Sequence, residues 1–208
     1  MAGPAVARAD HLKRGIYLEH LTIGWNLFEA AAAITCGSVA GSVALIGFGF
    51  DSLIETSSGG ILLWRLRAER SGQEIETLER RALRLVGISF LLLAVYVTFA
   101  SIRTLLIRQK PEQSDIGIAL AILSVIVMPL LARLKRRTAA HLGSAALRAD
   151  SRQSSICAYL SAILLGGLGL NALFGWWWAD SLAAILMAPI IIKEGLEGLR
   201  GEVCVDCR

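Results

Sequence analysis

Apolar residues dominate the chain in long runs that are separated by short polar or charged segments. A helix that crosses a bilayer needs about 20 mostly apolar residues, and six runs approach or reach that length: 16–36, 39–64, 85–107, 116–131, 155–173 and 176–192. These runs lack the period-two alternation of transmembrane β-strands. The pattern predicts an all-α polytopic membrane protein, one six-helix transmembrane bundle with turns at Gly37-Ser38 and Gly175.

Basic residues indicate how this bundle is oriented. Of the 21 Lys and Arg residues, all but Arg103, Arg108 and Lys110 lie on one side of the predicted spans, and Lys135 is counted there as a loop residue. Cytoplasmic loops carry an excess of Lys and Arg. We therefore expect both termini in the cytoplasm and the protein in the plasma (inner) membrane. Residues 193–208 would form a short cytoplasmic tail, and 65–84 a charged helical arm.

Composition narrows the class of protein further. The chain has 208 residues, of which 55% are hydrophobic and 18% charged, and its mean hydropathy is +0.59. That apolar content excludes a disordered chain. The net charge of +4 comes from bases placed between apolar runs, which orient a bilayer protein. We therefore expect a lipid bilayer and no nucleic acid as partner. No nucleophile–base pair or cofactor motif indicates an enzyme.

Two acidic residues stand inside the second predicted span. Asp51 and Glu55 are four residues apart, so they lie on one helix face about 6 Å apart along the axis. An acid at mid-membrane costs roughly 2.5–3.5 kcal/mol on insertion scales. No Lys or Arg in the span can neutralise the pair, so a divalent cation or protons would fill the gap between them. The alternative is hydrogen bonding across helices or a water-filled groove.

The fifth span offers further ligands on one helical stripe, which is formed by Asp150, Gln153, Ser154 and Cys157. Counted from the charged borders, Glu55 lies about 15 Å and Cys157 about 13.5 Å into the membrane. Asp51, Glu55 and Cys157, with Gln153, could then form a metal site if the two helices touch. A lone cysteine in an apolar span is otherwise a small buried hydrophobe.

Other polar residues are candidates for gating, the ion pathway or a tail site. Glu29, with Asn26 one turn before it, stands in the first span, and Asp180 follows Trp176-Trp177-Trp178 near the outer surface. At the C-terminus Cys204-Val205-Asp206-Cys207 is a single CxxC motif. Two thiolates are half the ligands of a closed zinc site, so this pair could hand over metal, complete a site in a dimer, or be plain thiols.

The second and fifth spans carry a family resemblance. Gly47-Phe48-Gly49-Phe50-Asp51-Ser52-Leu53-Ile54-Glu55 resembles the second-helix signature of the cation diffusion facilitator (cation efflux) family, Asp-Ser-x-x-Asp. Leu147-Arg148-Ala149-Asp150 resembles the start of its fifth helix, where a His and an Asp follow at the positions of Gln153 and Cys157. The family consists of dimeric, proton-coupled exporters of zinc and other divalent metals, with a site shared between these helices.

The resemblance implies a homodimeric divalent-metal transporter that works by proton antiport. Metal ions, zinc or a similar transition metal, and protons would be its transported partners, with no resident cofactor. The family's cytoplasmic C-terminal domain is expected to be missing, so the chain would be a short form. Gln153 and Cys157 depart from the family pattern and soften the site. A non-transporting metal-sensing or interaction protein on the same fold is the rival hypothesis.

Overall fold

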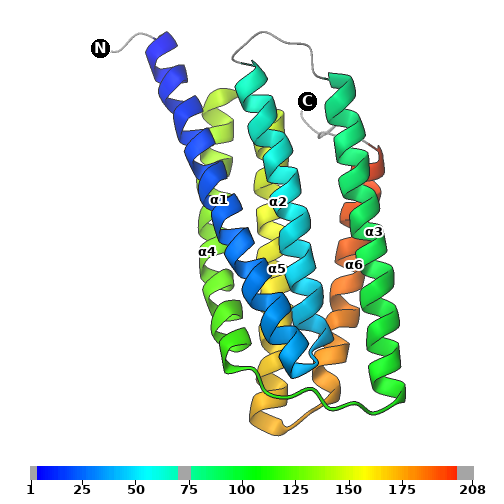
Figure 1. Ribbon diagram of the computed structural model, residues 1–208. Coiled ribbons are helices and arrows are strands. Elements are labelled where there is room, and N and C mark those ends of the chain that lie inside the picture. Colours follow the sequence, from blue (N-terminus) through cyan, green and yellow to red (C-terminus); the bar gives the residue numbers. More distant parts are fainter. Residues whose placement is uncertain (1–3, 70–75, 201–208) are drawn as a thin grey trace.

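Six α-helices run through the part of the chain that the structure describes, residues 4–69 and 76–200 (Figure 1). In this computed structural model the helices are α1 (Pro4–Ala40), α2 (Val43–Glu69), α3 (Glu76–Leu106), α4 (Asp115–Leu142), α5 (Ala145–Phe174) and α6 (Trp178–Arg200). The predicted all-α bundle is confirmed. Each helix extends beyond the apolar run that predicted it, except that α2 begins four residues later, α3 ends one residue earlier and α6 begins two residues later.

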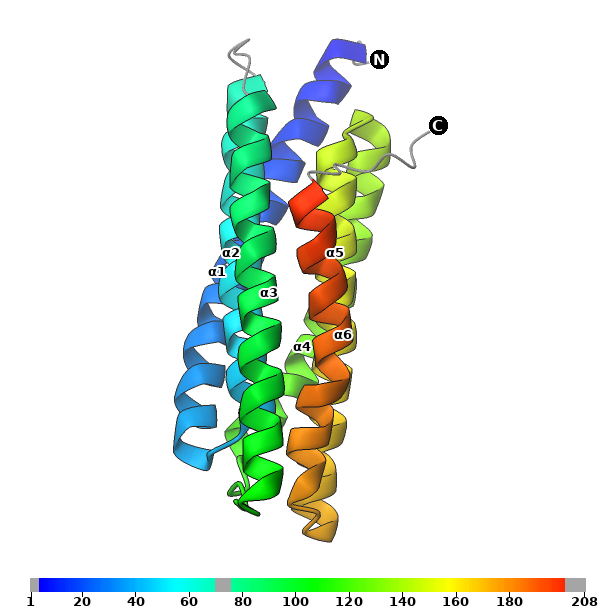
Figure 2. The same ribbon diagram turned by 90° about the vertical axis from the view of Figure 1, so that its right-hand side faces the viewer.

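The helices form two groups. α1, α2, α4 and α5 form one group, whereas α3 pairs with α6 (Figure 2). In this pair α3 contacts α2, and α6 contacts α5 and α2. Gly87 of α3 faces Gly195 of α6, where a Cβ on Gly87 would come within 2.7 Å of the Gly195 carbonyl oxygen. The backbones of α3 and α6 therefore touch at this crossing, in the manner of small-residue contacts in membranes.

The chain turns sharply at both ends of the bundle. α1 begins and α6 ends at one end, called the terminal end below, while the α1–α2 and α5–α6 turns lie at the opposite end (Figure 1). Gly41 takes the left-handed conformation, with φ 67°, between α1 and α2. The first turn thus comes four residues after Gly37, because α1 continues to Ala40. Ser38 still belongs to this helix, and its hydroxyl donates to the Ile34 carbonyl. Gly175, with φ 65°, caps α5 as the sequence indicated.

The molecule is apolar on its surface, and its interior contains polar side chains among the apolar ones. α3 exposes a stripe of large hydrophobic side chains, which includes Leu85, Leu92, Val95, Phe99 and Leu106. The interior holds acids, hydroxyls and a lysine. Three described segments, Arg84–Leu106, Asp115–Leu142 and Leu147–Phe174, are long and apolar enough to cross a membrane. An apolar surface of this extent is a surface for lipid, as expected for an integral membrane protein.

Candidate metal site

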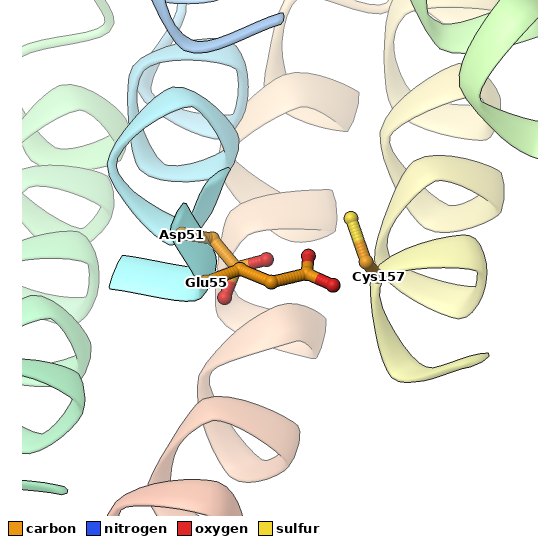
Figure 3. A group of neighbouring side chains, drawn as sticks. All are labelled: Asp51, Glu55 and Cys157. Carbon is orange, nitrogen blue, oxygen red and sulfur yellow. The ribbon is translucent and has the colours of Figure 1, made fainter. Parts of the chain in front are cut away.

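Two helices bring three potential metal ligands together in the interior. Asp51 and Glu55 come from α2 and Cys157 from α5, and one ligand atom of each lies within 4.8 Å of the others (Figure 3). Their exposed fractions are 5%, 2% and 1%. The carboxylate of Glu55 points toward Cys157 (Figure 3). The structure thus joins residues that lie about 100 positions apart in the sequence.

The donor set suits a soft-to-borderline divalent cation. Two carboxylates and a thiolate are three anionic ligands, and zinc takes oxygen ligands at about 2.0–2.2 Å and sulfur at about 2.3 Å. A tetrahedral ion therefore holds its ligand atoms about 3.5 Å apart. Side-chain rotations that move the ligand atoms by about 1 Å would bring the three residues to this spacing around an ion. Mg²⁺ and Ca²⁺ prefer all-oxygen sites, so the thiol disfavours them.

Glu29 of α1 borders this group. Its Oε2 accepts a hydrogen bond from Ser52 at 2.7 Å and one from the Cys157 thiol at 3.9 Å. Its Oε1 accepts a bond from Trp25 at 3.2 Å, and the side chain is fully buried. A third helix therefore supplies an acid beside the three ligands. Glu29, predicted for gating or the pathway, is in direct contact with a candidate ligand.

Two buried polar groups beside the site have unused bonding capacity. Ser154 donates to Glu55 Oε1 at 3.1 Å, but Glu55 Oε2 has no hydrogen-bond partner among the described residues. Asn26 is fully buried, and neither atom of its amide has a partner within 4–69 and 76–200. A buried polar group without a partner costs about 1–3 kcal/mol. Hydrated cargo is one kind of ligand that such groups can bind.

Gln153 takes a different position from the corner that the sequence suggested. Its side-chain oxygen accepts a hydrogen bond from Ser58 of α2 at 3.0 Å, and Ser58 lies about one turn beyond Glu55 toward the terminal end. The structure therefore brings Gln153 to the next level of the bundle. The fifth-span stripe still faces inward as a whole, because Asp150, Ser154 and Cys157 all bond to interior partners.

The sequence reading missed a buried ion cluster. Lys135, predicted to lie in a loop, is fully buried, because α4 continues to Leu142. Its ammonium lies 2.5 Å from Asp150 of α5 and 3.0 Å from Glu19 of α1. Glu19 shares a helix face of α1 with Asn26 and Glu29. This common face of α1 was the signal that could have revealed it.

Comparison with known proteins decides the family. A family model described as the cation efflux transmembrane domain matches residues 20–203, which include Glu29 and all three candidate ligands. The chain belongs to the cation efflux family.

This cation efflux chain is similar in sequence to proteins from several organisms. Transmembrane protein 163 of Xenopus laevis is 28% identical over 189 residues, which cover 90% of this chain and 67% of the relative. The uncharacterized transporter sll1263 of Synechocystis is 25% identical over 186 residues, 86% of this chain and 60% of the relative. The cation-efflux pump FieF of Shewanella oneidensis is 30% identical over 113 residues, which cover 54% of this chain and 36% of the relative. The chain therefore spans about three fifths to two thirds of the first two relatives.

Asp180, another candidate for the pathway, binds backbone in this cation efflux bundle. Its carboxylate accepts hydrogen bonds from the Ser42 hydroxyl at 2.5 Å and from the Val43 amide at 2.9 Å. It thereby caps the N-terminus of α2, where a negative charge is favourable. Cys204 and Cys207, the candidate tail site, lie outside the described residues.

Proposed function

We propose that the protein exports a divalent transition-metal cation, zinc or a similar ion, across the membrane in exchange for protons. The observation that carries this proposal is the cluster of Asp51, Glu55 and Cys157, three potential anionic ligands buried between two helices of a cation efflux chain. A buried cluster of acids is costly in a membrane and marks an ion pathway in most proteins that contain one.

The chemistry of these ligands supports coupling to protons. A carboxylic acid or thiol must lose its proton before it binds metal, so metal binding releases protons. Protonation from the other side of the membrane then weakens the site and expels the ion. Rocking of helices around a fixed mid-membrane site would open it to each side in turn. We further propose a homodimer whose terminal end faces the cytoplasm. The 17 bases that remain on that side once the buried Lys135 is left out favour this orientation.

The decisive experiment is metal flux in proteoliposomes that contain the full chain. A zinc-sensitive dye inside the vesicles reports uptake while an acidic lumen supplies the outward proton gradient. We expect uptake that falls when a protonophore collapses the gradient. Asp51→Ala should reduce it to the background of empty vesicles, because an anionic ligand is gone. Asp115→Ala, an exposed acid on α4, is the matched control. Zinc binding without flux would favour the metal-sensing hypothesis instead.

Cys157 should set the choice of metal. A thiolate favours zinc-like ions over manganese, which prefers oxygen ligands. We expect Cys157→Ser to lower the preference for zinc over manganese by about tenfold, which corresponds to about 1.4 kcal/mol. Cys36→Ser, at a half-buried thiol of α1, should leave the preference unchanged. The readout is flux across a panel of ions, and equal selectivity in both variants would make Cys157 a packing residue.

A further inference from the structure

The ion cluster of Glu19, Lys135 and Asp150 lies in the interior of α1, α2, α4 and α5. The Lys135 ammonium is bound by one carboxylate from α1 and one from α5. The exposed fractions of Lys135 and Glu19 are 0%, and that of Asp150 is 6%. The cluster is therefore a buried cation held by two carboxylates.

This cluster lies on the terminal side of the candidate metal site. Glu19 Oε1 is so close to α2 that a Cβ on Gly59 would meet it at 2.6 Å, and Gly59 is one turn beyond Glu55. Asp150 lies two turns before Cys157 on α5. Both offsets amount to about 6–10 Å along the bundle axis. An ion that moves between the terminal end and the metal site through these four helices passes the cluster.

The cluster leaves negative charge and hydrogen-bonding capacity unmatched. Two carboxylates face one ammonium, and Glu19 Oε1 is buried without a hydrogen-bond partner in the described part of the chain. Buried ion pairs of this kind contribute little to stability, because the cost of desolvation offsets the attraction. A divalent cation would balance both carboxylates and could use the unpartnered oxygen as well.

We propose that Glu19 and Asp150 form a second cation position, occupied here by the ammonium of Lys135 as a tethered substitute. A divalent cation takes this position when the lysine side chain withdraws, and then passes to Asp51, Glu55 and Cys157. The transit step rests on the proposed transport function, whereas the existence of the second position does not.

The test counts bound zinc on purified full-length protein by equilibrium dialysis. Cys204→Ser and Cys207→Ser are present throughout, so that tail thiols bind nothing. The zinc concentration is set just above the one that saturates the protein with Lys135 in place. At this concentration we expect Lys135→Met to bind one more ion per chain than that protein. Lys135→Met with Asp150→Asn should lose this additional ion. Arg133→Met, which removes an exposed positive charge from α4 two residues away, should bind as the parent does.

The design separates the two proposals. If the Asp51 site is assigned wrongly, Asp51→Ala leaves the parent count unchanged, yet Lys135→Met still adds one ion to it. If Lys135→Met folds and adds no ion, the second position is refuted whatever the transport result.

Lys135→Arg tests the withdrawal step in a variant that keeps the positive charge. A guanidinium can bind carboxylates through two parallel hydrogen bonds, so it should leave more slowly. We expect zinc flux to fall about tenfold, or about 1.4 kcal/mol in the barrier, with zinc binding at the first site unchanged. Flux equal to that of the parent would show that the lysine stays in place during transport and would overturn the proposal.

Discussion

The interior differs on the two sides of the metal site. Toward the terminal end it contains the charged cluster of Glu19, Lys135 and Asp150. Toward the opposite end it contains apolar side chains that are fully buried, Leu45 and Phe48 of α2 with Leu160 and Leu164 of α5. Both regions close the space between the same helices. They do so with opposite chemistry.

This difference separates stability from exchange. Apolar side chains gain free energy from burial and lose it when the packing opens. An ion cluster gains little net free energy, but its cation can be replaced by another cation without leaving the carboxylates uncompensated. The apolar side is thus suited to hold the bundle together, and the charged side to admit an ion.

The largest expected contrast compares Phe48 with the whole ion cluster. Phe48→Ala leaves a cavity and should lower the free energy of unfolding by about 3–5 kcal/mol. Neutralising the cluster with Glu19→Gln, Lys135→Met and Asp150→Asn together should cost less than about 1 kcal/mol or even stabilise the protein. Denaturant unfolding in detergent measures both. Equal losses would mean that the two sides do not differ in the way proposed.

A smaller contrast uses two adjacent glycines of α2. Gly59→Ala would push a methyl group against Glu19 Oε1, whereas nothing lies within 4 Å of a Cβ on Gly60. We expect Gly59→Ala to cost about 1–3 kcal/mol by displacing Glu19. Gly60→Ala should be neutral or stabilise by up to about 1 kcal/mol, because alanine favours the helix. Thermal unfolding of the two variants compares them, and indistinguishable values would argue against contact between Glu19 and α2.

The smallest effect concerns the hydroxyl pair on the apolar side. Ser161 of α5 donates to Ser124 of α4 at 2.9 Å. Ser161→Ala should cost about 1–2 kcal/mol, because it leaves the Ser124 oxygen buried without this partner. Ser124→Ala with Ser161→Ala should cost less than the single variant. A double-mutant cycle on unfolding free energies measures the coupling, and an additive result would show that the pair is not a unit.

The fold was accessible from the sequence because apolar runs and basic loops are local signals. Asp51, Glu55 and Cys157 could be proposed together because helical rise converts residue counts into depth. Lys135 could not be placed in this way. A lysine near the end of an apolar run has the pattern of a loop residue, and only its neighbours on α1 and α5 reveal its burial. Gln153 differs from its predicted position at the metal site for a related reason. Residue spacing predicts which helix face a side chain lies on, but not which residue it contacts on the neighbouring helix.

The hydrogen bonds between Asp180 and the start of α2 hold one end of α6 in place. Asp180 lies at the beginning of α6, so its bonds to Ser42 and Val43 pin α6 to α2 at the opposite end of the bundle. From there α6 runs about 30 Å to Arg200. A tilt of about 10° around this pinned end would shift the terminal end of α6 by about 5 Å and leave the cap intact. Movements that preserve this joint therefore have their greatest amplitude at the terminal end.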